Sequence, residues 1–283
     1  MTDPRLSYVT CAHPGGLHRV AYWEWGASDN PSVVLCVHGL TRSGRDFDAL
    51  ARVLARGHRV ICPDMPGRGR SEPLADPDLY SIPQYVADCV TLVARLGVER
   101  VSWVGTSMGG LIGMMYAALA GHPIERLLLN DVGPALATEG LSRIATYVGQ
   151  APTFATYEEA SAYLRELSAG FGPMEAAQWD LLARPYWVQE GGRWRVHYDP
   201  RIAEPIRKAA GQPAPDLWPL YDAVRCPTWL VRGQVSDLLS EATAREMARR
   251  GPRATLVEVP GVGHAPTFIP ADQIAIVERF LAA

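Results

Sequence analysis

The stretch "VSWVGTSMGG", residues 101–110, decides the fold class of this chain. It begins as a short apolar run rich in β-branched residues, which is typical of a buried strand, and stops at Ser107 between Gly105 and Gly109. An apolar helical pattern follows at once. The pattern G-x-S-x-G between a strand and a helix marks a nucleophile elbow, a tight turn that projects a serine hydroxyl clear of a sheet. The stretch therefore predicts an α/β fold with Ser107 as a nucleophile.

Similar apolar runs recur along the chain and alternate with helical patterns. Runs such as "SVVLCVHG" and "PTWLVRG" suit strands that are buried on both faces of a parallel sheet. The helical segment after Ser81 has Gln84 three residues further on and stops at Gly97, so both of its ends are marked. The alternating segment "LHRVAYWEW" suits a half-buried antiparallel strand. This order predicts a mostly parallel sheet with helices on both faces and a site at the carboxyl ends of the strands.

Residues 133–219 interrupt the alternation of strands and helices. They contain helix-like pieces such as "YEEASAYLREL" but no run typical of a parallel strand. We interpret them as an inserted, mostly helical cap, which leaves residues 1–132 and 220–283 as the core. The aromatic residues of this segment predict a hydrophobic lid and uncharged substrates of medium size; they are Phe154, Tyr157, Tyr163, Phe171, Trp179, Tyr186 and Trp187.

The bulk composition argues for a small-molecule partner. The 283 residues carry a formal net charge of −3, and Lys and Arg are scattered, so there is no electrostatic footprint for nucleic acid or an anionic membrane. The amino terminus "MTDPRLSYVT" lacks the pattern of a signal peptide, and no apolar run approaches the length of a membrane span. We therefore expect a cytoplasmic protein.

No cofactor or metal is expected from the motifs. The five cysteines form no CxxC pair and suit reduced core positions. No group of His, Cys, Asp and Glu has the spacing of metal ligands in the sequence. The glycine-rich stretch "CPDMPGRGRS", residues 62–71, contains neither of the phosphate-binding glycine motifs.

The histidine that could activate Ser107 is His264, in "VEVPGVGHAP" after the last predicted strand. A serine hydroxyl is a weak nucleophile and needs a base with a pKa of about 6.5, which a carboxylate orients. His264 would lie at the carboxyl edge of the sheet, where Ser107 also emerges. We therefore predict His264 as the general base.

Two aspartates follow predicted strands and could orient His264. Asp237 follows "PTWLVRG", the strand after the cap, and Asp131 ends "ERLLLND", the strand before it. Either choice gives the order nucleophile, acid, base along the chain. The residues alone leave both open, although "NDVGP" also suits a turn that opens the cap.

Two backbone N–H groups are expected to bind the oxyanion of an acyl-transfer intermediate. One belongs to Met108, directly after the nucleophile. The other belongs to Leu40, because His38 and Gly39 end an earlier strand at the same edge of the sheet. His38 itself suits a structural role in bracing this loop.

Several of these motifs together resemble the α/β-hydrolase superfamily, in its capped branch of small carboxylesterases, enol-lactonases and C–C bond hydrolases. They are "VHGLTRSGRDFDALA", "DMPGRGRS", "VGTSMGG", the aspartate after "WLVRG" and "GVGHAP". The resemblance implies an eight-stranded, mostly parallel sheet with an antiparallel second strand and a cap inserted after the sixth. It also favours Asp237 over Asp131, because the loop after that strand is the more usual position of the acid in the family. The implied triad is thus Ser107, Asp237 and His264.

The resulting hypothesis is a serine hydrolase that cleaves a carboxylic ester or lactone of a small to medium, largely apolar substrate through an acyl-enzyme. One alternative is a C–C bond hydrolase of vinylogous diketones, although such relatives typically carry H-G-x-G where this chain has "HGLT" from His38. Another alternative is a ligand-binding protein that keeps the hydrolase fold without turnover. The complete set of serine, acid, histidine and glycines argues against a pure binding protein.

Overall fold

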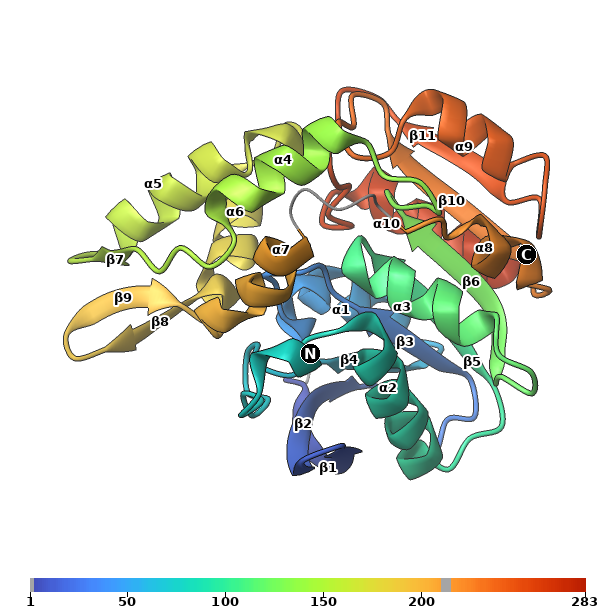
Figure 1. The fold of residues 1–283 in the computed structure, drawn as a ribbon, viewed down its shortest axis with the longest axis horizontal. Coiled ribbons are helices and arrows are strands. Elements are labelled where there is room, and N and C mark those ends of the chain that lie inside the picture. The colour runs from blue at the N-terminus through green and yellow to red at the C-terminus, as the bar shows by residue number, and fades with distance from the viewer. Residues whose placement is uncertain (1–2, 210–214) are drawn as a thin grey trace.

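The computed structural model describes residues 3–209 and 215–283 and is built on one large sheet (Figure 1). Eight strands lie in the order β1-β2-β4-β3-β5-β6-β10-β11. Strand β2 is antiparallel to both of its neighbours, and the remaining pairs are parallel. The predicted eight-stranded sheet with an antiparallel second strand is therefore confirmed. The bounds are β1 Arg5–His13, β2 Gly16–Trp25, β3 Val33–Val37, β4 Arg59–Pro63, β5 Val101–Thr106, β6 Ile124–Asn130, β10 Thr228–Gly233 and β11 Thr255–Val259.

Helices cover both faces of this sheet, as the sequence predicted. Successive residues of a strand point to opposite faces. Trp103 and Leu127 accordingly pack in one apolar cluster, and Val104 and Leu128 pack in another. The first cluster includes side chains of α2 and α3, and the second includes side chains of α1 and α10. The helices of the core are α1 Asp48–Leu54, α2 Ile82–Leu96, α3 Met108–Ala117, α8 Trp218–Ala223, α9 Glu241–Met247 and α10 Ala271–Ala282.

Helix α2 has the two ends that the sequence predicted. The Ser81 hydroxyl accepts a hydrogen bond from the Gln84 N–H at 3.4 Å and satisfies one of the free amides at the start of the helix. Gly97 ends the helix in the left-handed conformation, with φ of 67°. Local sequence alone thus determines where this helix begins and ends.

The segment predicted as a cap leaves the sheet after β6 and returns to it at β10. Its helices are accompanied by a three-stranded antiparallel sheet in the order β7-β9-β8, which the sequence analysis did not predict. Those strands are two to four residues long, too short to show a period of alternation. The elements are α4 Thr138–Tyr147, β7 Thr153–Phe154, α5 Tyr157–Leu167, α6 Ala176–Ala183, β8 Trp187–Glu190, β9 Arg193–Val196 and α7 Glu204–Ala209.

One helix crosses the predicted border between cap and core at residues 219 and 220. Helix α8 begins at Trp218, and its Tyr221 hydroxyl donates a hydrogen bond to the Met247 carbonyl at 2.6 Å. Tyr221 is fully buried in the apolar cluster that also holds Met247. This helix is therefore attached to α9 of the core.

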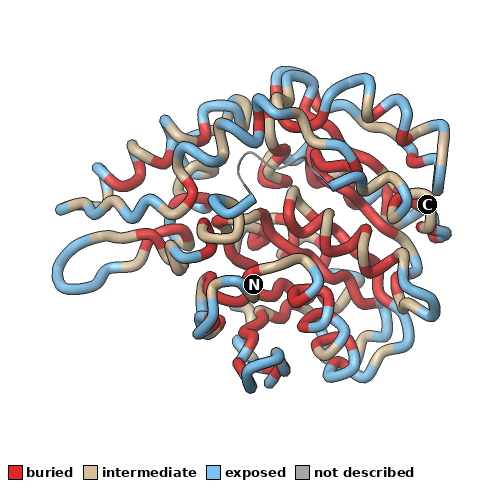
Figure 2. Tube along the Cα trace, in the orientation of Figure 1, coloured by how far each residue is buried: buried red, intermediate tan, exposed pale blue. Residues whose placement is uncertain are grey.

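Burial differs between the two parts of the chain. Figure 2 shows the central strands buried along their length, whereas the tip of the β8–β9 hairpin is exposed. Within residues 3–209 and 215–283, none of the helices combines the length and the apolar character required to cross a membrane.

Candidate active site

Ser107 occupies a sharp turn between β5 and α3. Its backbone has φ of 52° and ψ of −114°, a strained combination for a residue with a side chain. The flanking glycines are required by close backbone contacts. A Cβ on Gly105 would lie 2.3 Å from the Gly109 carbonyl oxygen, and a Cβ on Gly109 would lie 2.0 Å from the Val37 carbonyl oxygen. The turn therefore exists only because both positions lack a side chain.

His264 lies beside this serine, on the loop that follows β11. Its Nε2 is 2.9 Å from Ser107 Oγ, and its Nδ1 is 2.7 Å from Asp131 Oδ2. The imidazole side chain is 9% exposed, so one edge remains open to the cavity above it. Ser107 and His264, both predicted from the sequence, are thus brought into hydrogen-bond contact.

Asp131 is the carboxylate that orients His264. It follows β6 directly, has φ of 54° and is completely buried. Oδ1 accepts a hydrogen bond from the Gly233 N–H at 2.9 Å, and Oδ2 accepts one from the Ser236 hydroxyl at 2.6 Å. Burying an unpaired carboxylate is costly. These donors and His264 together surround Asp131 with polar partners.

Asp237, which the family resemblance favoured as the acid, lies elsewhere. Its carboxylate forms a two-point ion pair with Arg143 of α4, at 2.5 Å to Nε and 2.9 Å to Nη2. The Arg143 guanidinium holds the pKa of this carboxyl below its ordinary value. The expected contact with His264 is made by Asp131 instead.

The turn after β10 explains why Asp131, and not Asp237, contacts His264. Ser236 Oγ accepts hydrogen bonds from the N–H groups of Leu238 and Leu239, at 3.2 and 3.1 Å, while it donates to Asp131. This turn is anchored on the Asp131 carboxylate, and Asp237 reaches Arg143 on the cap. A possible signal in the sequence was that Asp131 immediately follows its strand, whereas Asp237 lies four residues beyond the end of β10.

The two predicted oxyanion donors lie next to the serine. Met108 is the first residue of α3, so its N–H belongs to the helix start, where amides have no intrahelical acceptor. Leu40 lines the same cavity as Ser107. Their role as oxyanion donors remains a prediction.

Arg68 is a buried residue of this site whose role sequence reasoning missed. Its Nε donates to the Leu40 carbonyl at 2.9 Å, and its Nη1 donates to the Tyr85 hydroxyl at 2.7 Å. Its Nη2 lies 3.7 Å from Met108 Sδ. One guanidinium therefore touches both residues predicted to bind the oxyanion. It belongs to "CPDMPGRGRS", a stretch that the family resemblance includes without assigning a role to Arg68.

His38 braces the loop that carries Leu40. Its Nδ1 is 2.7 Å from the Gly39 carbonyl oxygen, and its Nε2 accepts a hydrogen bond from the Met65 N–H at 2.9 Å. Burial lowers the pKa of His38 to about 3. The imidazole is therefore neutral, with its proton on Nδ1, and it holds the loop in place as the sequence analysis favoured.

The cavity above Ser107 is closed by the cap. It occupies about 850 Å³ including its mouth, between the loops after β3, β5 and β11 and the cap residues of α4 and α5. Of the seven cap aromatics noted in the sequence, only Phe171 and Tyr186 line it. Two guanidinium groups, those of Arg42 and Arg143, line it as well. The cavity is thus less apolar than the sequence predicted.

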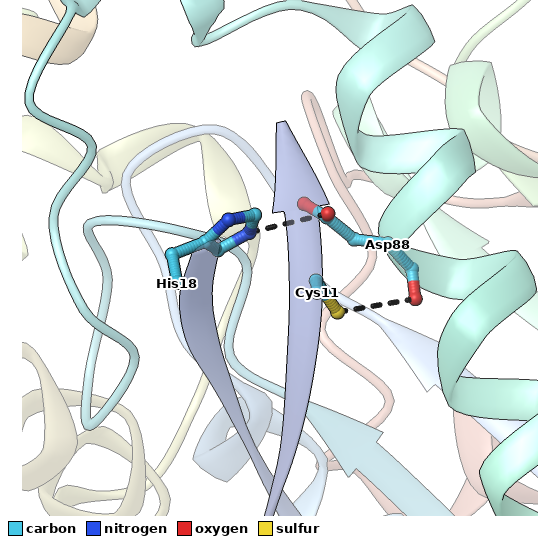
Figure 3. Close-up of side chains that lie close together, drawn as sticks. All are labelled: Cys11, His18 and Asp88. Atoms are coloured by element: carbon cyan, nitrogen blue, oxygen red, sulfur yellow. Dashed lines mark hydrogen bonds and ion pairs between the residues drawn. The ribbon is translucent and has the colours of Figure 1, made fainter. Parts of the chain in front are cut away.

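A second cluster of polar side chains lies on the hairpin β1–β2 and α2, and it contains Cys11, His18 and Asp88 (Figure 3). The possible ligand atoms of the three lie within 4.8 Å of one another, although their spacing in the sequence gave no such signal. His18 Nε2 is 3.1 Å from Asp88 Oδ1, without the alignment of a good hydrogen bond. Burial and the Asp88 charge raise the pKa of the Cys11 thiol to about 12, so the thiol is protonated at neutral pH. The cluster therefore acts as a buried polar contact between the hairpin and α2.

Comparison with known proteins places this geometry in a family. The alpha/beta hydrolase family matches residues 34–276. A 3-hydroxybutyrate-oligomer hydrolase of Cupriavidus necator is 52% identical, with 98% of each chain covered. A crystal structure of an alpha/beta hydrolase from Novosphingobium aromaticivorans has a TM-score of 0.89 at 41% identity and covers 100% of this chain and 99% of its own. E-2-(acetamidomethylene)succinate hydrolase shares the fold, with a TM-score of 0.84 at 22% identity and coverage of 99% and 100%.

The position of Asp131 predicts unequal effects for two aspartate variants. Asp131→Asn should lower kcat on a p-nitrophenyl ester by about 10³-fold or more, because it disturbs the proton position on His264. Asp237→Asn removes only the ion pair with Arg143 and should lower kcat by less than about tenfold. Steady-state kinetics of the two purified variants tests this assignment, and a larger loss for Asp237→Asn would contradict it.

The buried His38 predicts a loss of stability in acid. In the unfolded chain His38 binds a proton below about pH 6.5, whereas in the folded protein it stays neutral down to a pKa of about 3. Its contribution is present above pH 6.5 and is lost as the pH falls. When the pH is lowered from 7.5 to 5, the urea midpoint of unfolding should therefore fall more for the wild type than for His38→Gln. Equal pH dependence would show that another group is responsible.

The contact between His18 and Asp88 predicts a large effect on stability. Asp88→Ala leaves His18 buried without its acid and should lower the free energy of unfolding by about 3 kcal/mol. Glu99→Ala, at an exposed position, serves as the control and should change it by less than about 0.5 kcal/mol. Urea denaturation followed by tryptophan fluorescence measures both, and similar small effects would mean that the pair contributes little.

Proposed function

Because the chain belongs to the alpha/beta hydrolase family and is an ester-bond hydrolase, we propose that its substrates are short oligomers of 3-hydroxybutyrate. The support for this substrate is the Cupriavidus necator relative, a 3-hydroxybutyrate-oligomer hydrolase at 52% identity over nearly the whole of both chains. The substrate is a small-molecule ester, in line with the partner expected from the composition. A cytoplasmic location stays a prediction.

The observation that carries the mechanism is the chain of contacts from Ser107 through His264 to Asp131, at 2.9 and 2.7 Å. Nucleophile, base and orienting acid are in contact in the order that acyl transfer requires. We further assign the binding of the oxyanion to the N–H groups of Leu40, which lines the cavity, and of Met108, which follows the serine in the chain. The site therefore contains each part needed for an acyl-enzyme mechanism.

The reaction proceeds in two halves. Ser107 Oγ attacks the ester carbonyl carbon while His264 Nε2 takes its proton, and the oxyanion is bound by the two backbone N–H groups. When the intermediate collapses, the bond to the alcohol oxygen breaks and His264 returns the proton to that oxygen. Water then attacks the acyl-enzyme with His264 again as the base, which releases the acid and restores the Ser107 hydroxyl. Asp131 keeps its negative charge and stabilises the protonated imidazole.

The burial of Asp131 is compatible with this role. Its three polar partners hold the carboxylate in place with Oδ2 at His264 Nδ1, so that Nε2 faces Ser107 and takes the proton in catalysis. Ser236 thereby becomes a residue that holds the acid in position. The sequence analysis did not single it out, because a serine in a turn has no distinctive pattern.

The proposed substrate predicts a measurable product. The purified protein should release 3-hydroxybutyrate from its linear dimer and trimer, as detected by liquid chromatography, and Ser107→Ala should lower kcat by about 10³-fold or more because it removes the nucleophile. A fluorophosphonate should label the wild type and not Ser107→Ala.

Other outcomes separate the alternatives. Hydrolysis of p-nitrophenyl butyrate without cleavage of the 3-hydroxybutyrate oligomers would contradict the proposed substrate but not the esterase mechanism. Cleavage of a vinylogous diketone in preference to all esters would favour the C–C hydrolase. Folded wild-type protein that resists the fluorophosphonate would favour a ligand-binding protein.

A further inference from the structure

We propose that Arg42 and Arg143 form a binding subsite for a carboxylate at the end of the substrate's leaving group. The enzyme then prefers esters that end in a free acid over their neutral counterparts. This inference rests on the proposed function, because it concerns which esters enter the same cavity. It also runs against the uncharged substrates that the cap aromatics predicted.

Both arginines line the cavity that contains Ser107 and His264. Arg42 lies on the core loop after β3, and Arg143 lies on helix α4 of the cap segment. A Cβ added to Gly39 would lie 3.7 Å from Ser107 Cβ and 3.8 Å from Arg42 Cγ. Gly39 therefore lies between Ser107 and the aliphatic part of the Arg42 side chain and is near to both. A substrate bound to Ser107 therefore occupies the same cavity that the two arginines line.

Each arginine is fixed by a carboxylate through two bonds. Arg42 donates to Asp46 from Nε at 2.6 Å and from Nη2 at 2.8 Å. Arg143 uses the same two nitrogens on Asp237. A two-point pair holds the plane of the guanidinium and does not use Nη1. Both groups are thus oriented before a ligand arrives.

Arg42 has a donor that the protein itself does not satisfy. Its side chain is 10% exposed, and within the part of the chain that the structure describes Nη1 is buried without a hydrogen-bond acceptor. Arg42 Nη2 also donates to the Leu182 carbonyl, and the Tyr186 ring lies 4.9 Å from the guanidinium carbon, so the cap shields this group from water. A buried donor without a partner is costly. An acceptor supplied by the substrate would satisfy it.

Arg143 is the more accessible of the two. Its side chain is 40% exposed, and its neighbours Ile144 and Tyr147 also line the cavity. A carboxylate between Arg143 and Arg42 would contact one guanidinium from the cap and one from the core. Binding of the acid end would therefore also hold the cap against the core.

The chemistry of the proposed substrate fits this arrangement. In a dimer of 3-hydroxybutyrate, four covalent bonds separate the free carboxylate carbon from the carbonyl carbon that Ser107 attacks, at most roughly 5 Å, because an extended chain advances by about 1.25 Å per bond. Both groups therefore fit in one cavity. Because Asp46 and Asp237 already pair with the two guanidinium groups, the substrate carboxylate is bound through the N–H donors that these pairs leave over. A neutral ester gains less from these side chains, because its carbonyl oxygen is a weaker acceptor than a carboxylate.

The test compares one dimer in two forms. The kcat/KM for the free acid of the 3-hydroxybutyrate dimer is divided by the kcat/KM for its methyl ester, so that losses common to both substrates cancel. Arg143→Gln and Arg42→Gln should each lower this ratio by about tenfold or more, because each removes a charge-assisted hydrogen bond to the carboxylate. A ratio equal to that of the wild type in both variants would overturn the proposal.

Asp237→Asn is the matched control for Arg143→Gln. It breaks the same ion pair between cap and core but keeps the guanidinium and its charge, so it should lower the ratio clearly less than Arg143→Gln does. If Asp237→Asn lowers the ratio as much as Arg143→Gln does, Arg143 acts only by attaching the cap, and the proposal fails.

An inhibition experiment separates this inference from the proposed function. Free 3-hydroxybutyrate should inhibit hydrolysis of p-nitrophenyl butyrate competitively, and Arg143→Gln and Arg42→Gln should each raise its inhibition constant about tenfold. This measurement does not require that the oligomers be hydrolysed. An unchanged inhibition constant in both variants would overturn the subsite, whatever the natural ester is.

Discussion

The buried carboxylate of Asp131 is the interaction on which the site depends. It accepts hydrogen bonds from the Gly233 N–H and the Ser236 hydroxyl and contacts His264 Nδ1, so it joins the carboxyl ends of β6 and β10 and the loop after β11. A carboxylate removed from water is tolerated only when such partners replace the lost hydration. The same bonds that stabilise the charge therefore fix the orientation of the base. The hydrogen bonds of Asp131 thus serve both the folding of this edge of the sheet and the positioning of His264.

The nucleophile depends on a different constraint, the close approach of backbone segments. Gly105 and Gly109 let β5 turn into α3 with no side chain between the elbow and β3, and Ser107 accepts a strained backbone conformation as a result. Arg68 and His38 support the other side of the site by holding the loop of Leu40. The core therefore carries the catalytic residues, and the cap contributes side chains that line the rest of the cavity.

The cap changes the expected character of the substrate. Its aromatic residues were predicted to line a hydrophobic lid, but Phe154, Tyr163 and Trp187 contact one another within the cap in tilted and edge-to-face arrangements. The side chains that reach the cavity include Arg143, paired with Asp237 of the core. An aromatic-rich sequence thus stabilises the lid itself, and a few polar residues give the cavity its electrostatic character.

The sequence by itself determined the fold, the elbow and the histidine, because each has a local signature: apolar strand runs, glycines around Ser107, and His264 after the last strand. It could not choose between Asp131 and Asp237, since both follow strands that end at the same edge of the sheet. Only the tertiary structure decided, by anchoring the turn at Ser236 on Asp131 and pairing Asp237 with the cap. The physical reason is that hydrogen-bond partners distant in the chain become neighbours only when the strands are assembled.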